Sequence, residues 1–203
     1  GDYIKSIVIE SGVTSIGSYA FSMRQSLTSV TIGEGVMTIG DSAFFSCDAL
    51  VSVTIPDSVT SISGRAFSSC TSLKNITIPN GVTIIDESTF YGCTGLTSVT
   101  IPDSVTKIGW SAFFRCSSLE SIDLPSGVTS IDFGAFSGCT SLSSITIPSG
   151  VTGIWDSTFR DCTGLTSVTI PDSVKMISSS AFSGCTGLTS ISIPNGVTSL
   201  GSS

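Results

Sequence analysis

The sequence contains no histidine, and only 11% of its 203 residues carry charge. Without histidine it cannot form a Ser-His or Cys-His catalytic pair, and no glycine-rich phosphate loop follows a strand pattern. Eight basic residues stand against fifteen acidic ones, which gives a formal net charge of −7. Nucleic acids and anionic membranes are bound through clustered Lys and Arg, so neither is an expected partner. These absences predict a protein that is not an enzyme and needs no cofactor.

Long apolar segments are also missing. No run approaches the ~20 apolar residues that span a membrane, and the N-terminal residues do not form a secretory signal peptide. The opening GDYIKSIVIE already reads as the middle of a repeat, and the closing residues carry no capping pattern. We therefore expect the chain to be a segment of a longer array.

What the sequence does contain is a repeat of 23 residues, marked by three residue types. The phenylalanines are Phe21, Phe44, Phe67, Phe90, Phe113, Phe136, Phe159 and Phe182. The prolines are Pro56, Pro79, Pro102, Pro125, Pro148, Pro171 and Pro194. The cysteines are Cys47, Cys70, Cys93, Cys116, Cys139, Cys162 and Cys185. This spacing defines eight full repeats over 4–187 and a partial ninth over 188–203, which we interpret as a single solenoid covering 1–203.

One repeat, LTSVTIPDSVTKIGWSAFFRCSS from Leu96, illustrates the expected coil. Leu96, Val99 and Ile101 form an LxxVxI pattern in which apolar and polar residues alternate, as is typical of a half-buried strand. Pro102 ends that strand because proline cannot donate to a strand ladder. A second apolar pair, in VTKI, predicts another short strand, and SAFF predicts one turn of 3₁₀ or α helix or an irregular bend.

A single coil buries too little apolar surface to fold alone, so the coils must stack and share their interfaces. In such a stack each repeat position lies next to its equivalent in the neighbouring coils. We therefore predict a right-handed solenoid with short 3₁₀ or α turns and parallel, in-register β ladders. One ladder is expected at the central strand position, which holds Val30, Val53, Ile76, Val99, Ile122, Ile145, Val168 and Ile191.

Each cysteine stands alone in its coil. Zinc sites use close pairs such as CxxC, so we expect no metal site. Disulfides between neighbouring coils are an alternative. However, in-register side chains point in parallel, which holds their Cβ atoms near ~4.8 Å, beyond the ~3.5–4.5 Å of a disulfide. We interpret the seven cysteines as buried, reduced thiols.

Two sets of outward polar residues have more than one interpretation. Aspartates such as Asp57 and Asp103 share a turn position, but calcium needs six or more oxygens and these residues lie in separate coils, so solvated turns are favoured. A Ser/Thr ladder on the strand face is compatible with binding ice or a polysaccharide, although Asn75, Glu120 and Asp123 interrupt it. The ladder consists of Ser29, Thr31, Ser52, Thr54, Ser98, Thr100, Ser144, Thr146, Ser167 and Thr169.

The pattern AFxxCxxLxxVxIPxxVxxI, as in SAFSGCTGLTSISIPNGVTSL over 180–200, resembles the BspA-like leucine-rich repeat family of the Treponema pallidum type. The resemblance covers essentially the whole chain. It departs near the start, where Arg24 stands at a cysteine position and Glu10 and Gly33 stand at proline positions. The family occurs in surface and secreted proteins of anaerobic bacteria and some parasitic protists, and its better-known members resemble adhesins. The resemblance thus implies a leucine-rich repeat solenoid, and it carries over no catalytic residue.

The repeats differ most around the Ala-Phe pair. Large aromatic residues and Arg, which are the types that anchor interfaces, stand there in place of small residues. We expect them to lie on one edge of the solenoid and to bind a partner, with Trp110 and Trp155 as anchors; packing between coils is the alternative. The predicted partner-binding residues are Tyr19, Phe45, Arg65, Tyr91, Trp110, Phe114, Arg115, Phe133, Trp155 and Arg160.

Two functions are compatible with such a chain. The leading hypothesis is an extracellular or cell-surface interaction module, an adhesin that binds a protein or glycan on another cell or in the matrix. The alternative is a structural spacer or self-assembling subunit of a surface layer or filament. It would rest on end-to-end self-association of open solenoid ends, which expose apolar side chains and unpaired backbone groups.

Overall fold

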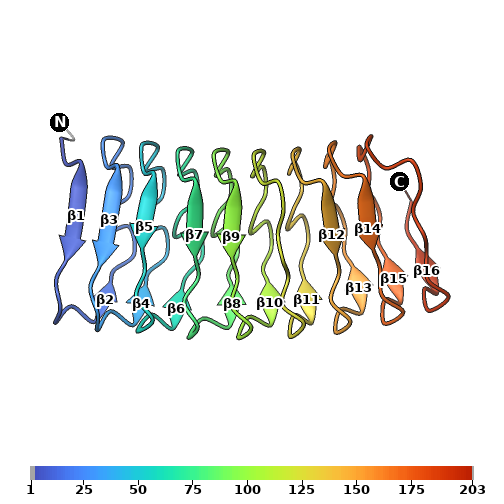
Figure 1. Ribbon diagram of the computed structural model, residues 1–203, viewed down its shortest axis with the longest axis horizontal. Coiled ribbons are helices and arrows are strands. Elements are labelled where there is room, and N and C mark those ends of the chain that lie inside the picture. Colours follow the sequence, from blue (N-terminus) through green and yellow to red (C-terminus); the bar gives the residue numbers. More distant parts are fainter. Residues whose placement is uncertain (1–2, 203) are drawn as a thin grey trace.

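The computed structural model describes residues 3–202. Its coils lie side by side along one axis, from β1 (Ser6–Ile9) at one end to β16 (Ser199–Leu200) at the other (Figure 1). Paired strands are parallel and join residues one repeat apart, as in Ser29↔Ser52 and Thr38↔Ser61. The predicted parallel solenoid of 23-residue coils is confirmed.

Two sides of each coil are built from short strands. The first strand side carries β1, β3 (Ser29–Ile32), β5 (Ser52–Thr54), β7 (Asn75–Thr77), β9 (Ser98–Thr100), β12 (Ser144–Thr146) and β14 (Ser167–Thr169). The second strand side carries β2 (Ser15–Ile16), β4 (Thr38–Ile39), β6 (Ser61–Ile62), β8 (Ile84–Ile85), β10 (Lys107–Ile108), β11 (Ser130–Ile131), β13 (Gly153–Ile154), β15 (Met176–Ile177) and β16.

The predicted ladder on the first strand side is only partly correct. Val30 pairs with Val53, Ile76 with Val99 and Ile145 with Val168, in the expected register. The ladder is nevertheless divided into β1-β3-β5, β7-β9 and β12-β14, and the segments around Ile122 and Ile191 are not strands. A hollow of about 150 Å³ beside Ser121–Leu124 marks one of these breaks. The stack persists there because neighbouring coils are also bonded along a third side.

The third side, here called the Ala-Phe side, comprises the residues from four before to two after the repeated Phe of each coil, such as 40–46 and 109–115. Of the two predicted alternatives, the turn of 3₁₀ or α helix is wrong, since residues 3–202 contain no helix, and the irregular bend is correct. Instead, two residues per coil adopt the left-handed region, for example Ser42 at φ 53° and Ser46 at φ 54°. They alternate with turns in which Ala43 and Phe45 donate to carbonyls three residues back.

This alternation points three N–H groups of each coil at the next coil. Ser42 N–H donates to Gly64 O at 3.0 Å, and Phe44 N–H donates to Ala66 O at 2.8 Å. Ser46 N–H donates to Ser68 O at 2.8 Å. The same three bonds recur at every junction from the coil of Tyr19 to the coil of Ser183. The Ala-Phe side therefore holds the longest unbroken hydrogen-bond ladder of the described chain.

The core is a column of stacked phenylalanines. From Phe21 to Phe182 the ring centroids of neighbouring coils lie 5.4 to 5.9 Å apart. The rings from Phe44 to Phe159 have no solvent exposure. Leu, Val, Ile and Ala positions of both strand sides pack around this column. Each coil is thus filled by the side chains of its own repeat and closed by those of its neighbours.

The cysteines are free thiols buried beside this column, as predicted. Each thiol donates to the carbonyl of the Phe in the preceding coil, as in Cys116 Sγ to Phe90 O at 3.1 Å. Burial raises the pKa of the Cys93 and Cys139 thiols to about 12. Cys93 and Cys139 therefore stay protonated at neutral pH.

Candidate groove on the Ala-Phe side

A groove of about 770 Å³ crosses the Ala-Phe side over three neighbouring coils. Its lining comes from the same backbone positions in each coil, namely two and three residues before the repeated Phe and one and two residues after it. The lining residues are Trp110, Ser111, Phe114, Arg115, Phe133, Gly134, Ser137, Gly138, Asp156, Ser157, Arg160 and Asp161. Because these positions belong to the continuous hydrogen-bond ladder, the groove is built on a rigid part of the solenoid.

The floor exists because the middle coil carries small residues. Gly134 and Gly138 occupy its two left-handed positions, at φ 59° and 75°, and Ser137 lies between them. In the coil before, the corresponding wall residues are the much larger Phe114 and Arg115. A Cβ added to Gly138 would lie 3.1 Å from the Arg115 Cγ atom, so glycine leaves room for the arginine side chain to lie across the floor.

Aromatic side chains form one end and one wall of the groove. Trp110 and Phe133 are 61% and 48% exposed, although both are large and apolar. Phe133 packs against Trp155 of the following coil, with ring centroids 5.5 Å apart. Phe114 stacks on Tyr91 of the preceding coil at 4.8 Å. Neighbouring coils thus hold Phe114 and Phe133 in place, while Trp110 and Phe133 remain open to solvent.

The charges in the groove are only partly paired. The Arg115 guanidinium lies 5.3 Å from the Phe114 ring centroid, a cation–π contact, and has no carboxylate partner within residues 3–202. On the facing wall, Arg160 and Asp161 approach at 3.5 Å, and Asp156 accepts a hydrogen bond from the Ser157 hydroxyl. The groove therefore offers one unpaired, pre-oriented guanidinium beside exposed aromatic faces.

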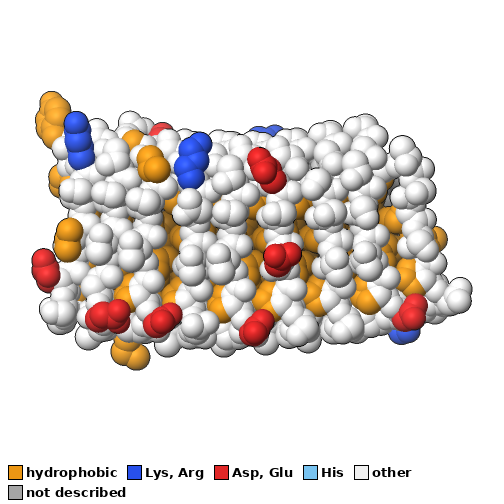
Figure 2. Space-filling model, viewed as in Figure 1, with side chains coloured by type: hydrophobic (Ala, Val, Ile, Leu, Met, Phe, Trp, Pro, Cys, Tyr) orange, Lys and Arg blue, Asp and Glu red, His pale blue; other side chains and the backbone are white. Residues whose placement is uncertain are grey.

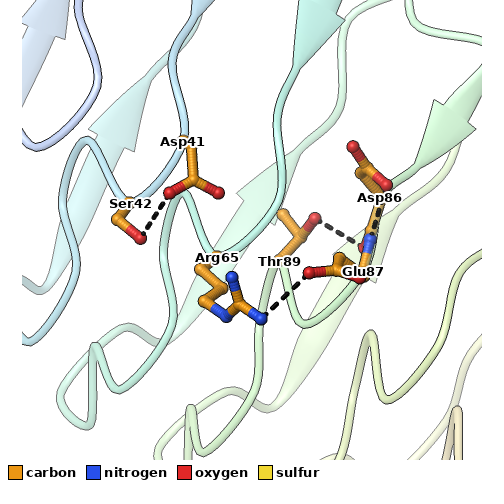
Figure 3. Close-up of polar contacts among 6 residues, drawn as sticks. All are labelled: Asp41, Ser42, Arg65, Asp86, Glu87 and Thr89. Carbon is orange, nitrogen blue, oxygen red and sulfur yellow. Dashed lines mark hydrogen bonds and ion pairs between the residues drawn. The ribbon is translucent and has the colours of Figure 1, made fainter.

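A different pairing is present closer to the N-terminus on the same side. Arg65 Nη2 lies 2.9 Å from Glu87 Oε1, and Asp41 accepts a hydrogen bond from Ser42 (Figure 3). Thr89 donates to the backbone carbonyl of Asp86 in the same region. The Arg65 charge is therefore neutralised within the protein, in contrast to that of Arg115.

Comparison with known proteins identifies the repeat. The model of the BspA type leucine rich repeat region, in six copies, matches residues 1–120 and 106–203. The chain belongs to the BspA-type leucine-rich repeat family. No curated protein sequence matches it.

Solved structures of other leucine-rich repeat proteins share the fold. A leucine-rich repeat protein from Bacteroides ovatus ATCC 8483 is 34% identical with a TM-score of 0.86, over 96% of this chain and 53% of that one. The Treponema pallidum leucine-rich repeat protein is 28% identical with a TM-score of 0.65, over 91% and 78%. A leucine rich cell surface protein from Faecalibacterium prausnitzii A2-165 is 28% identical with a TM-score of 0.55, over 98% and 79%. The chain spans about half the length of the B. ovatus protein.

The BspA-type coils bring some of the predicted partner-binding residues together and leave others apart. Five of the ten line the groove, namely Trp110, Phe114, Arg115, Phe133 and Arg160. Tyr91 and Trp155 touch it indirectly, through their stacked neighbours. Tyr19, Phe45 and Arg65 lie on the Ala-Phe side but outside the groove. Packing between coils, the alternative interpretation, therefore applies to Tyr91, Trp155 and part of Phe114.

Sequence reasoning missed the floor of the groove. It weighed large residues in the variable positions and passed over Gly134, Ser137 and Gly138. Of these, Ser137 and Gly138 are small where the flanking repeats carry larger residues. A hollow depends on that contrast, so the aligned repeats did contain the signal. Asp156 was also missed, because an acidic residue just before the repeated Phe is normally interpreted as part of a solvated turn.

Figure 2 shows one face of the described residues that is mostly white, because Ser, Thr and backbone atoms cover it. Acidic side chains lie mainly along its lower edge, with a few higher on the face. Within residues 3–202 no group of three or more Asp, Glu, His or Cys residues is placed to hold a metal ion. The same residues include no helix that is long and apolar enough to cross a membrane.

Proposed function

We propose that this BspA-type chain is a non-enzymatic interaction module, exposed on a cell surface or secreted, that binds a protein or glycan on another cell or in the matrix. Its contact surface is the Ala-Phe side, centred on the groove. The observation that carries the proposal is the exposure of Trp110 and Phe133 beside an open groove, next to a column of fully buried phenylalanines. Exposed aromatics in a hollow are typical anchors of interfaces.

Two further observations support this assignment. The groove lies on the side whose backbone bonds are continuous, so a partner would meet side chains that are already held in position. A similar protein from Faecalibacterium prausnitzii is a leucine rich cell surface protein, which supports a surface location for this chain.

The test is retention of defined partners by the immobilised, monomeric protein. A panel of extracellular matrix proteins and of glycans would be passed over it, and binding measured by surface plasmon resonance. The double variant Trp110→Ser/Trp155→Ser should lose the partner that the parent retains. Tyr19→Ser is the matched control, because Tyr19 is 62% exposed on the same side but outside the groove. Undiminished binding by a folded double variant would move the contact to the Ser/Thr strand face.

A structural role is the second candidate, favoured by the regular stack in which coils pair with the next in parallel register. An array of this kind can serve as a spacer or add further coils end to end. Sedimentation that shows concentration-dependent elongated oligomers, with no partner retained from the panel, would favour a spacer or filament subunit over an interaction module.

A further inference from the structure

The floor of the groove contains a buried hydroxyl that the protein itself does not use. Ser137 is only 5% exposed, and its side chain has no hydrogen-bond partner within residues 3–202. Two equivalent serines of other coils do have one. Ser68 donates to Tyr91 O at 3.3 Å, and Ser22 donates to Phe45 O at 3.4 Å. A buried polar group without a partner is rare in proteins and indicates a ligand or water at that point.

The unpaired hydroxyl lies in the same groove as the unpaired guanidinium. Ser137 and Arg115 both line it, and the side chain of Arg115 runs across Gly138, the neighbour of Ser137. The contact with Phe114 holds the guanidinium beside that ring, and no carboxylate among residues 3–202 pairs with its N–H groups. A guanidinium held in this way matches the two oxygens of a carboxylate.

The open aromatic faces determine what else the ligand presents. Trp110 and Phe133 line the groove and are largely exposed, so their aromatic rings are accessible to a ligand there. The weakly positive C–H groups on one face of a sugar ring pack well on such a surface. Sugar hydroxyls would in turn meet Asp156 and the serines that line the floor and walls.

A peptide fits these groups less well. An extended peptide gains its affinity from free backbone N–H and C=O groups on the receptor. The floor has none to offer through its amides, since Gly134 N–H and Gly138 N–H already donate to Asp156 O and Arg160 O of the next coil. Side-chain hydroxyl, carboxylate and guanidinium groups remain, and these suit a sugar.

Charge limits the kind of acidic sugar. The chain has a net charge of −7, which disfavours a long polyanion. Within the groove, Arg160 pairs with Asp161, whereas Arg115 has no carboxylate partner among residues 3–202, so Arg115 can accept one anionic group. We propose that the groove binds the end of a glycan whose terminal sugar carries a single carboxylate. The carboxylate pairs with Arg115, a sugar hydroxyl bonds Ser137, and a ring packs on Trp110.

The experiment compares 3′-sialyllactose with lactose, its neutral counterpart, by titration calorimetry on the whole chain. This proposal rests on the proposed function, since it names the partner class of the same groove. The acidic sugar should bind at least about tenfold more tightly than lactose, and Arg115→Gln should abolish the difference. Ser137→Ala should weaken binding by about threefold to tenfold without loss of folding stability. Added salt should weaken the binding of the acidic sugar more than that of lactose.

Matched controls separate binding from folding. Arg65→Gln removes an exposed arginine of the Ala-Phe side that is paired with Glu87, and Ser68→Ala removes the hydroxyl that bonds Tyr91 O. Both should leave sugar binding unchanged. Equal binding of the two sugars, no binding of either, or tighter binding of a Glu/Tyr-rich acidic peptide would overturn the proposal. If the sugars fail while a matrix protein is still retained through Trp110 and Trp155, the proposed function stands and only this inference falls. If nothing is retained, both fall.

Discussion

At the residue scale, the repeated Phe and Cys act as a pair across the junction between coils. The Phe44 carbonyl accepts the Cys47 N–H of its own coil at 3.3 Å and the Cys70 thiol of the next coil at 3.2 Å. The Phe ring fills the centre of the coil while its carbonyl receives these two donors. The Cys position requires a small side chain that is a weak hydrogen-bond donor, because it lies in the closed core.

Phe113→Ala tests the central column. The ring is fully buried between Phe90 and Phe136, so its removal should cost about 3–5 kcal/mol of unfolding free energy. Urea denaturation of the two proteins measures the difference. Phe133→Ala is the control, because this ring is 48% exposed and its loss should cost less than about 1 kcal/mol. Equal midpoints for Phe113→Ala and the parent protein would contradict a core role.

The buried thiols should make the protein sensitive to alkali. Burial raises the pKa of Cys93 and Cys139 to about 12, whereas the pKa of a thiol in the unfolded chain is about 8.5. The unfolded state therefore loses its thiol protons first as the pH rises. Stability should be intact below about pH 8 and should fall above it by about 1.4 kcal/mol per pH unit for each such thiol.

Urea midpoints between pH 7 and 11 measure this effect. Cys93→Ala/Cys139→Ala should show a shallower decline than the parent, whatever its stability at neutral pH. Thiol labelling is the independent check. It should be slow in the native protein and should reach seven equivalents after unfolding, since all seven cysteines are free and buried. An identical pH dependence in both proteins would rule out the thiols as the cause.

At the element scale, the Ala-Phe side depends on residues that hold a left-handed backbone without being glycine. Ser46 lies at φ 54° and Ser69 at φ 61°, in a region that costs L-residues about 1–2 kcal/mol. Each such residue aims one N–H at the next coil, as Ser46 does toward Ser68 O. The conformation is maintained because the inter-coil bond and the packed Phe beside it offset that cost.

Ser46→Val tests this balance. A β-branched side chain is poorly tolerated at positive φ, so the variant should lose about 1–2 kcal/mol of unfolding free energy. Ser98→Val makes the same change at an exposed position of β9, where valine is a good strand former, and should be close to neutral. Thermal unfolding of both variants decides the matter. Equal losses at the two positions would mean that side-chain volume, and not backbone conformation, governs the effect.

The strands were predictable from sequence and the third side was not. Alternation at Val99 and Ile101 and the stop at Pro102 place β9 correctly, because a half-buried strand imposes that period of two. The breaks at Ile122 and Ile191 could not be anticipated, since they depend on how coils are spaced by bonds elsewhere. Residues such as Ser, Arg, Tyr and Met occupy the left-handed positions as well as Gly, so residue type does not predict this backbone conformation.

The groove could be predicted only in part from the sequence. Large residues such as Trp110 and Arg115 are visible in one repeat, but a hollow is a property of three repeats side by side. The gap over Ser137 arises only when Phe114 and Arg160 flank it from neighbouring coils.

At the scale of the whole molecule, each coil touches only its neighbours, so the chain is a nearly one-dimensional stack. Deleting residues 73–95, which removes one repeat and joins Ser72 to Leu96, should leave a folded solenoid of lower stability. Deleting 73–84 removes only part of a repeat and should disrupt folding, because it brings strand residues opposite Ala-Phe residues. Circular dichroism and urea midpoints distinguish the outcomes. Similar behaviour of the two deletions would argue against a shared register.

The inter-coil hydrogen bonds of the Ala-Phe side all run in one direction, so this side has a net electric dipole. Each peptide group carries a dipole of about 3.5 D, and in β-strands successive dipoles alternate and nearly cancel. Along the Ala-Phe side, N–H groups such as those of Ser42 and Phe44 all point toward the C-terminal coils, so their dipoles add. Bonds on the first strand side run both ways, as in Thr28 N–H to Lys5 O and Ile78 N–H to Thr100 O, so the net polarity is confined to the Ala-Phe side. A charged solute along that flank is therefore drawn toward one end of the solenoid, and the sign of its charge decides which end. Relative to the N-to-C direction of the chain, the dipole points opposite to that of an α-helix.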